Sequence, residues 1–283
     1  MAKTVVTKLK ILMCSSEAVP YAKSGGLADA VSSLSLALAQ MGHDVKIVMP
    51  RYYGINREVL KRQEGALGVP MAGGEEWCAV YTGDLPAGPL TKIKNPVQVH
   101  FIDHEGFFGR DGIYGTHFEP DFLDNPRRFS FFCRAIFQLC RKIDWYPDVL
   151  HAHDWPTALV PVFLRNVEKH RSFAKTRSVL TIHNLGYQGI YSKDSFFYTG
   201  LGWDVFYNAG FEDWNMINLL KAGLYSADKL NTVSPNYAEE TKIQAHGFRL
   251  DGVLRYRAAD YSGILNGIDL GVWNPQKDAL IPR

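Results

Sequence analysis

The sequence predicts an α/β fold in which helices cover a doubly wound, mostly parallel sheet. Three observations lead to this prediction. The chain begins with a strand–loop–helix–strand unit, strand-like and helical segments continue to alternate after it, and polar clusters follow several strands. Such alternation is typical of parallel strands joined by helical crossovers, and open sheets of this kind bind ligands at the carboxyl ends of their strands.

The first unit is defined by hydrophobic spacing. Residues 10–15 are mainly apolar and predict a buried strand. Apolar residues three and four positions apart then predict a helix from Leu27 to Met41, which Gly42 ends. Residues 44–49 predict a second buried strand, so the unit has the order expected of a βαβ motif.

The loop between this first strand and helix has the composition of an anion site. Gly25 and Gly26 allow a ligand to approach the backbone, the helix start offers free amides, and Lys23 adds positive charge. The loop therefore suits a phosphate or diphosphate. The alternative is that the two glycines serve only a tight turn. The loop matches neither the dinucleotide fingerprint nor the Walker motif, so neither function gains support.

Composition excludes several classes of partner. The chain has 283 residues, 46% of them hydrophobic and 21% charged, and a net charge of +2, which gives no reason to expect nucleic acid or an anionic membrane. Its four cysteines form no Cys-x-x-Cys pair, so they indicate reduced thiols rather than a zinc site. No secretory signal or 18-residue apolar run occurs, and we expect a cytoplasmic protein without a membrane span.

The remaining elements follow from turn residues and caps. Residues 53–96 are rich in glycine and proline and predict an irregular excursion with short antiparallel strands, and residues 103–121 predict a surface loop near a site. Asn125 is expected to cap a helix that has Pro126 in its first position. Further strands are expected at 96–102, 149–152, 178–182, 229–233 and 264–265, and further helices at 157–166, at 214–225 and after Ser234.

Polar clusters follow four of the predicted parallel strands, and parallel strands end at one edge of a sheet. We therefore expect these side chains to form one site. An alternative is a zinc site, because histidines two apart on a strand point to the same side. The clusters are residues 23–29, His151–Trp155 with His153 and Asp154, His183–Gly189 with Asn184, Tyr187 and Gln188, and Asn266–Asp269.

Taken together, these segments resemble bacterial glycogen synthases and plant starch synthases, the ADP-glucose-dependent α-1,4-glucan glucosyltransferases. Ser24 stands where that family usually has threonine, and the hydroxyl is kept. The matching segments span nearly the whole chain in the family's order. They are Ser15–Glu17, Lys23–Asp29, His151–Trp155, Thr181–Gly189, Leu220–Leu224, Thr232–Ala238 and Leu265–Asp269.

The resemblance implies one Rossmann-like lobe of a two-lobed glycosyltransferase. Residues 1–267 would form the N-terminal, acceptor-side lobe, and residues 268–283 would begin the linker to a C-terminal donor lobe. The implied reaction transfers glucose from ADP-glucose to an α-1,4-glucan such as glycogen with retention of configuration, without a metal or other cofactor. The choice between ADP-glucose and UDP-glucose stays open, because the base-binding residues would lie in the donor lobe. We expect the isolated lobe to have little activity, and the oligomeric state stays open.

The resemblance also implies residue roles. Lys23 and the amides of Gly25 and Gly26 would stabilise the departing diphosphate, while Asp154 and His183 would orient the sugar. Asp29 is a further binding candidate, or it braces its helix, and His153 contacts substrate or supports the site from beneath. The other expected substrate contacts are Asn184, Tyr187, Gln188 and Asn266.

Two other functions are compatible with the residues. One is a non-catalytic glucan-binding module, which would bind the polymer without transferring glucose. The other is a metal-dependent hydrolase that uses His151, His153 and Asp154, with His183 as a further ligand.

Overall fold

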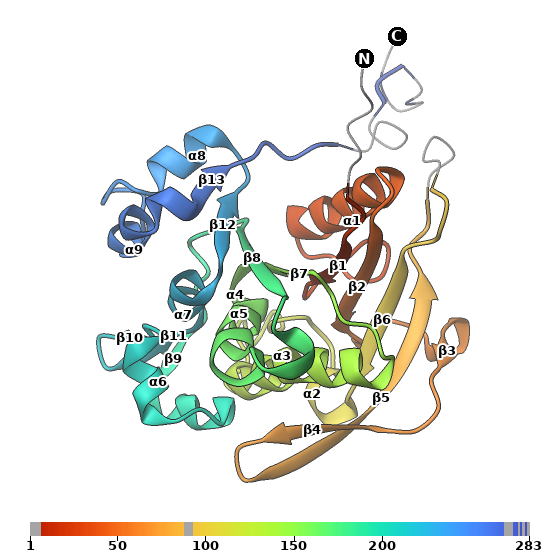
Figure 1. Cartoon of the computed structure of the whole chain (residues 1–283), viewed down its shortest axis with the longest axis horizontal. Helices are drawn as coiled ribbons and strands as arrows, with labels where there is room; N and C mark the ends of the chain where they lie inside the picture. Colours follow the sequence, from red (N-terminus) through yellow and green to blue (C-terminus); the bar gives the residue numbers. More distant parts are fainter. Residues whose placement is uncertain (1–6, 88–92, 269–273, 277, 279–280, 282–283) are drawn as a thin grey trace.

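The computed structural model describes residues 7–87, 93–268, 274–276, 278 and 281. Ten strands of this described part form one sheet in the order β13-β12-β8-β7-β1-β2-β6-β5-β3, with β4 paired to β5 (Figure 1). A smaller antiparallel sheet has the order β10-β11-β9. The strands are β1 (Lys10–Cys14), β2 (Asp44–Pro50), β3 (Lys61–Arg62), β4 (Leu67–Met71), β5 (Gly74–Asp84), β6 (Gln98–Asp103), β7 (Val149–His153), β8 (Arg177–Ile182), β9 (Ile190–Ser192), β10 (Glu212–Asp213), β11 (Met216–Asn218), β12 (Lys229–Thr232) and β13 (Tyr261–Gly263).

The main sheet confirms the predicted α/β class. Neighbours from β6 through β2, β1, β7, β8 and β12 to β13 are all parallel, and β3, β4 and β5 add an antiparallel flank. The chain builds outward from β1 through β2 to β6, and then returns to the other side of β1 with β7. The order therefore reverses between β1 and β7, and sheets of this kind bind ligands in the crevice at such a point.

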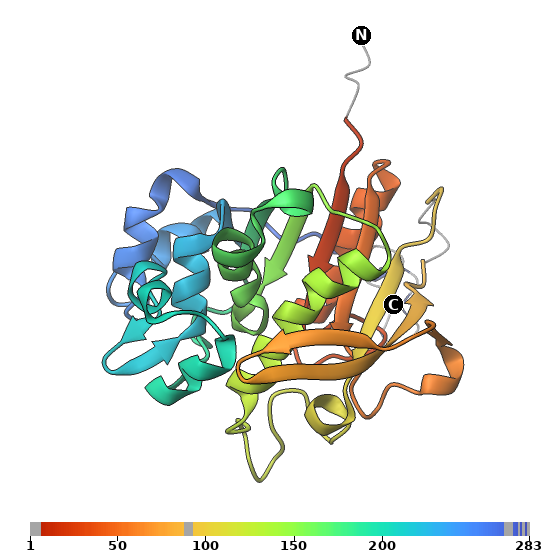
Figure 2. The same ribbon diagram turned by 60° about the horizontal axis from the view of Figure 1, so that its bottom comes forward.

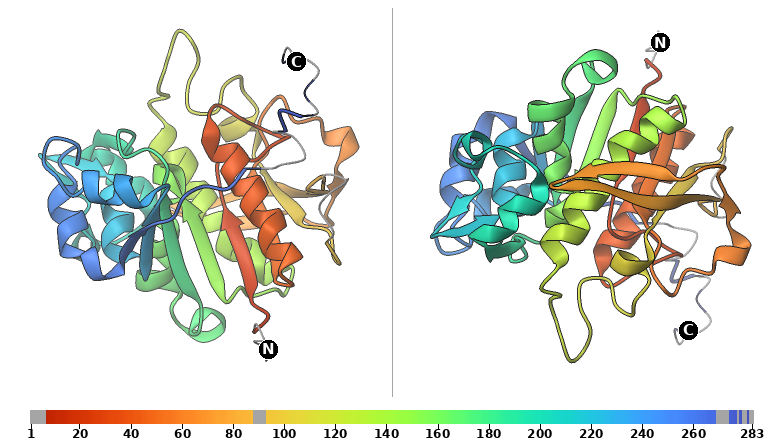
Figure 3. Two further views of the ribbon diagram at one scale, coloured as in Figure 1. Left: turned by 90° about the horizontal axis from the view of Figure 1, so that it is seen from above. Right: turned by 90° about the horizontal axis from the view of Figure 1, so that it is seen from below.

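Helices cover the sheet from both sides. Figure 3 shows α1 on one face, and α3 with α5 on the opposite face. The helices are α1 (Gly26–Gln40), α2 (Glu105–Phe108), α3 (Asn125–Lys142), α4 (Asp154–Thr157), α5 (Leu159–Phe163), α6 (Trp203–Asn208), α7 (Leu219–Ser226), α8 (Pro235–Glu240) and α9 (Asp251–Tyr256). Short helical turns are η1 (Arg57–Val59), η2 (Leu164–Glu168), η3 (Arg171–Phe173), η4 (Lys193–Thr199) and η5 (Ala258–Asp260).

Helix α3 lies at the centre of the core. Phe129, Phe131, Phe132 and Phe137 are fully buried, and Cys133 and Cys140 share this buried environment. Burial of one such aromatic side chain stabilises a fold by about 1.5–3 kcal/mol. The β4–β5 hairpin crosses over the outer side of α3 (Figure 2). In its described part, the glycine- and proline-rich region 53–96 forms the predicted antiparallel strands; β3 and β4 are short, whereas β5 is longer than expected, with 11 residues.

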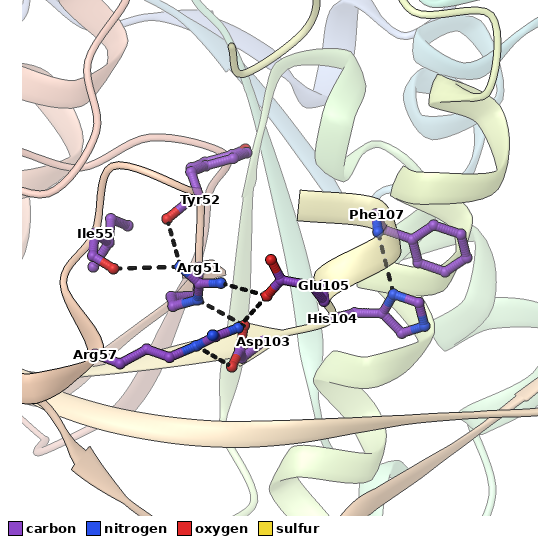
Figure 4. Close-up of polar contacts among 8 residues, drawn as sticks. All are labelled: Arg51, Tyr52, Ile55, Arg57, Asp103, His104, Glu105 and Phe107. Carbon is purple, nitrogen blue, oxygen red and sulfur yellow. Dashed lines mark hydrogen bonds and ion pairs between the residues drawn. The ribbon is translucent and has the colours of Figure 1, made fainter. Parts of the chain in front are cut away.

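A closed network of charges joins the ends of β2 and β6 (Figure 4). Arg51 Nε donates to Asp103 Oδ1 at 2.6 Å, and Arg57 Nε donates to Asp103 Oδ2 at 3.0 Å. The Arg51 guanidinium also contacts Glu105 Oε2 at 3.1 Å and the carbonyl of Tyr52 at 3.1 Å. Because Arg51 and Asp103 are buried, their charges need these partners, and the network fixes the start of the antiparallel flank.

Several predicted boundaries were wrong, among them the helix predicted at 157–166, which begins at Asp154 and is divided into α4, α5 and η2. Asp124, not Asn125, precedes α3, and the Asn125 amide instead donates to Asp121 Oδ1 at 2.6 Å. The helix expected from residue 214 begins at Leu219, because the left-handed backbone of Trp214 (φ 52°) and the next residue turns the chain from β10 to β11. The last strand is Tyr261–Gly263 rather than 264–265.

Candidate functional site

A cavity of about 870 Å³ lies where the loops after β1, β7 and β8 meet. Most of the predicted site residues line it, although they come from distant parts of the sequence. Asp29, Lys23 and His153 are not among the lining residues. Asp269, which ends the fourth predicted cluster, lies outside the described residues. The predicted residues on the cavity wall are Gly25, Gly26, Asp154, His183, Asn184, Tyr187, Gln188 and Asn266.

Asp154 connects the ends of β7 and β8. Its Oδ1 accepts a hydrogen bond from the backbone N–H of His183 at 2.7 Å and a longer one from Asn184 at 3.4 Å. Burial raises the pKa of the Asp154 carboxyl to about 7, although these amides favour the charged form. Its φ of 55° is unfavourable for a non-glycine residue. Such strain is typical of functional sites.

Three histidines lie together at this wall. The rings of His151 and His153 are stacked with centroids 4.3 Å apart, and His153 Nδ1 lies 3.1 Å from His183 Nε2. Burial lowers the pKa of His151 to about 3 and that of His183 to about 4, and it also lowers the pKa of His153. The three rings are therefore neutral near pH 7. They also border a second hollow of about 630 Å³ beside α1.

The glycine loop is held by a carboxylate that the sequence analysis did not assign to the site. Ser24 donates its backbone N–H to Glu17 Oε2 and its hydroxyl to Glu17 Oε1 at 2.7 Å. The Gly25 N–H reaches Glu17 Oε2 at 3.4 Å. Lys23 Nζ pairs with Asp29 Oδ2 at 2.7 Å, which supports the bracing role considered for Asp29. The cation and the first two loop amides thus have internal partners.

Residues of two further segments complete the wall. Tyr114 donates its hydroxyl to Glu17 Oε1 at 2.6 Å, and Tyr191 donates to Asp121 Oδ1 at 2.9 Å. Tyr114 and Asp121 lie in the region predicted as a surface loop near a site, so their neighbourhood was foreseen but not their identity. No local sequence signal identifies Tyr191, because its position depends on the pairing of β9 with β11.

Residues of the loop after β8 differ in their surroundings: Asn184 and Gln188 make hydrogen bonds within the protein, whereas Tyr187 is exposed. Asn184 Oδ1 accepts from the Gly186 N–H at 2.9 Å, which fixes a tight turn. The Gln188 amide is buried and donates to the carbonyls of Leu185 and Phe248, at 3.1 and 2.9 Å. Tyr187 is 68% exposed, which leaves its ring face accessible. Direct sugar contacts from Asn184 and Gln188 stay a prediction.

The described residues do not form the ligand set that a zinc site needs. In the described part of the chain, no group of three or more histidine, cysteine, aspartate or glutamate side chains is placed to hold a metal ion. His151 Nε2 contacts the Thr181 hydroxyl at 2.6 Å, and His153 Nδ1 faces His183. One nitrogen of each of the three rings is therefore engaged in a hydrogen bond. No described helix is long and apolar enough to cross a membrane.

Comparisons with known proteins agree on one family. Residues 10–256 match the starch synthase catalytic domain. The chain is 57% identical over 274 residues to a glycogen synthase of Treponema denticola, covering 97% of this chain and 54% of that protein. It is 46% identical to glycogen synthase 1 of Geobacter sulfurreducens over 96% of this chain and 54% of that protein.

A solved structure shows the same fold. The catalytic domain of starch synthase IV from Arabidopsis thaliana, bound to ADP and acarbose, superposes with a TM-score of 0.84. It is 29% identical, and the match covers 96% of this chain and 54% of that one. The chain therefore spans about half the length of the relatives that it matches.

Proposed function

This chain belongs to the starch synthase catalytic domain family, and we propose that it forms the acceptor-side half of an ADP-glucose-dependent α-1,4-glucan glucosyltransferase. On this proposal, residues 1–267 form the N-terminal lobe, and the chain from 268 leads toward a donor lobe. The single observation that carries the proposal is the convergence of Asp154, His183 and the glycine loop on one cavity. The four buried free thiols are consistent with a cytoplasmic protein.

The cavity suits a glucan acceptor. Its wall combines hydroxyl, carboxyl and amide groups with the aromatic side chains of Tyr114 and Tyr187. Sugar rings present hydroxyls at their edges and C–H groups on their faces, so they need both polar partners and aromatic surfaces. A carboxyl with a pKa near 7, such as that of Asp154, can accept a hydrogen bond from a hydroxyl or donate one to it. We assign Asp154 and His183 the task of orienting the reacting sugars.

The glycine loop suits the diphosphate of the donor. A Cβ added to Gly25 or Gly26 would meet no atom within 4 Å, so the chain's own packing does not require glycine there. The absence of side chains instead leaves room for a ligand against the start of α1. Lys23 lies at the edge of this loop and would contact the diphosphate after leaving Asp29.

The proposed chemistry balances without a metal. The bond between the anomeric carbon and the β-phosphate oxygen breaks, and the acceptor 4-hydroxyl oxygen bonds to that carbon. The acceptor proton passes to the departing diphosphate. Lys23, after leaving Asp29, and the loop amides, after Glu17 releases those of Ser24 and Gly25, would stabilise negative charge on the leaving group. The Arabidopsis structure, bound to ADP and acarbose, supports a nucleotide and a glucan-like ligand in this family.

Binding of maltoheptaose by the chain, measured by isothermal titration calorimetry, tests the proposal. Tyr187→Ala should weaken binding by roughly tenfold or less, since aromatic contacts contribute about 0.5–1.5 kcal/mol. Tyr256→Ala on α9 is a matched control, because Tyr256 is 76% exposed and is not among the lining residues. Equal effects of the two substitutions, or no binding by the wild type, would contradict the proposed acceptor site.

A transfer assay separates the glucosyltransferase half from other functions. The isolated chain should bind glucan but incorporate no labelled glucose from ADP-glucose into glycogen, because it spans about half the length of its relatives. Rapid incorporation by the purified chain would show that the second half is not needed. A non-catalytic glucan-binding module would bind maltoheptaose and stay inactive when the second half is supplied.

A further inference from the structure

We infer that His153 is a positioning residue that fixes His183 as the neutral tautomer with its proton on Nδ1. The inference deepens the proposed function, because His183 is assigned there to orient the sugar. It rests on the direct contact between the two rings and on the environment of the far nitrogen of His153.

The two rings must share one proton. His153 Nδ1 and His183 Nε2 lie 3.1 Å apart, which is hydrogen-bond distance. In a pair of neutral imidazoles, one nitrogen donates and the other accepts. Burial lowers the pKa values of both rings, so each is neutral and carries one ring proton. At 3.1 Å, two facing N–H groups or two facing lone pairs would repel each other, so one nitrogen carries the proton and the other accepts it.

The other ring nitrogen of His153, Nε2, determines which of the two histidines donates the hydrogen bond. His153 Nε2 is buried and has no hydrogen-bond partner among the described residues. If His183 donated to His153 Nδ1, the proton of His153 would sit on Nε2 and form a buried N–H without an acceptor. Such orphaned donors are rarer than unpaired acceptors. His153 therefore carries its proton on Nδ1 and donates it to His183 Nε2.

The surroundings hold His153 in this role. Its backbone N–H donates to Thr157 Oγ1 at 2.6 Å, and the Thr157 hydroxyl donates to the His153 carbonyl at 2.9 Å. With its Nε2 engaged as an acceptor, His183 keeps Nδ1–H as its single ring donor. It acts toward a sugar as a neutral hydrogen-bond donor, rather than as an imidazolium or an Nε2 base.

Two-bond ¹H–¹⁵N spectra of the chain with ¹⁵N-labelled histidine test the inference directly, since the two neutral tautomers have different ¹⁵N shift patterns. The His183 signals are assigned by their loss in His183→Asn. The inference predicts the Nδ1–H pattern for both His153 and His183 at pH 7. An Nε2–H pattern for His183, or a mixture of the tautomers, would overturn it.

Three variants separate positioning from general packing. His153→Asn keeps an N–H near the Nδ1 position and should preserve the His183 pattern, whereas His153→Leu removes the donor and should shift His183 to Nε2–H. His151→Gln is the matched control, because it keeps a donor for Thr181 and leaves the His153–His183 pair intact. If His153→Leu left the His183 pattern unchanged in a folded protein, the inference would be wrong.

Maltoheptaose binding links the tautomer to the site. His153→Leu should raise the dissociation constant several-fold, and His153→Asn should restore it to within about twofold of the wild type. The same loss in both variants would refute the positioning role. If the wild type showed the predicted tautomer but bound no maltoheptaose, the proposed function would fail while the tautomer assignment stood.

Discussion

Charged and polar side chains gather both at the ends of β2 and β6 and at the ends of β1, β7 and β8, but the two groups differ in how their polar atoms are satisfied. At β2 and β6, Arg51 and Arg57 share the carboxylates of Asp103 and Glu105, and the charges balance (Figure 4). At β7 and β8, Asp154 has amide partners but no cationic partner among the described residues, and its pKa is raised.

This difference separates a structural cluster from a binding site. A buried charge that is paired internally stabilises one conformation and leaves little for a ligand to contact. A buried carboxyl without a counter-ion, held at a strained φ beside neutral histidines, costs stability, and natural proteins accept such a cost mainly where it serves function. We therefore propose a structural role for the first group and a role in binding and chemistry for the second.

The largest expected effect lies in the closed network. Asp103→Ala leaves the buried Arg51 guanidinium without its main partner and should lower the free energy of unfolding by about 3–5 kcal/mol. Glu105→Ala is the control, because the Glu105 side chain is 64% exposed and surface pairs contribute about 0–1 kcal/mol. Urea denaturation measures both. Equal losses would show that burial does not set the importance of these pairs.

Lys23 should show the opposite balance between stability and activity. In a protein that carries both lobes, Lys23→Ala should raise the transition-state barrier by about 2–4 kcal/mol, as for loss of one oxyanion donor. Its exposed pair with Asp29 should contribute about 0–1 kcal/mol to stability. Lys242→Ala, which breaks an exposed pair with Glu239 on α8, serves as control. Wild-type turnover in Lys23→Ala would exclude the diphosphate role.

Asp154→Asn should stabilise the chain near neutral pH. The folded pKa of Asp154 is about 7, above the unfolded value of 3.8, so its contribution to stability falls as pH rises from 3.8 to 7. Removing the charge should therefore raise the free energy of unfolding by about 2 kcal/mol more at pH 7 than at pH 5. Asparagine also tolerates the left-handed backbone better. Urea unfolding at both pH values would reveal a pH-independent difference if this account is wrong.

His183 should produce a smaller effect of opposite sign. Its folded pKa is about 4 and its unfolded value 6.5, so the unfolded state binds more protons between these values. Stability is lost as the pH falls through this window, and His183 should account for about 1.5 kcal/mol between pH 6.5 and pH 5. The loss over that interval should shrink by this amount in His183→Asn. An unchanged loss would mean that His183 is not neutralised by burial.

The sequence predicted the fold better than the details of the site. Gly42 and the Ser234 cap end and begin helices as expected, because both act through local backbone chemistry. The strands that carry Asp154 and His183 were also found, since buried parallel strands are short apolar runs. The predicted helix start at Trp214 was wrong, because the left-handed turn at this residue depends on the pairing of β10 with β11.

The contacts of Glu17 could not be predicted from the sequence. Its motif contributed to the family resemblance, but nothing local predicts that its carboxylate turns back onto the amides of Ser24 and Gly25. The same holds for the pairing of Lys23 with Asp29 and for the stack of His151 on His153. These contacts join groups that the sequence identifies, but their partners are set by the tertiary fold.

The most direct test is a titration of the ¹⁵N-labelled chain with maltoheptaose, followed through the backbone amide signals. It asks whether the residues at the ends of β1, β7 and β8 form the binding site. The account predicts shifts for the amides around the cavity, including Gly25 and Asn184, and none for Arg51 and Asp103. Shifts confined to the ends of β2 and β6, with Gly25 and Asn184 unaffected, would contradict it.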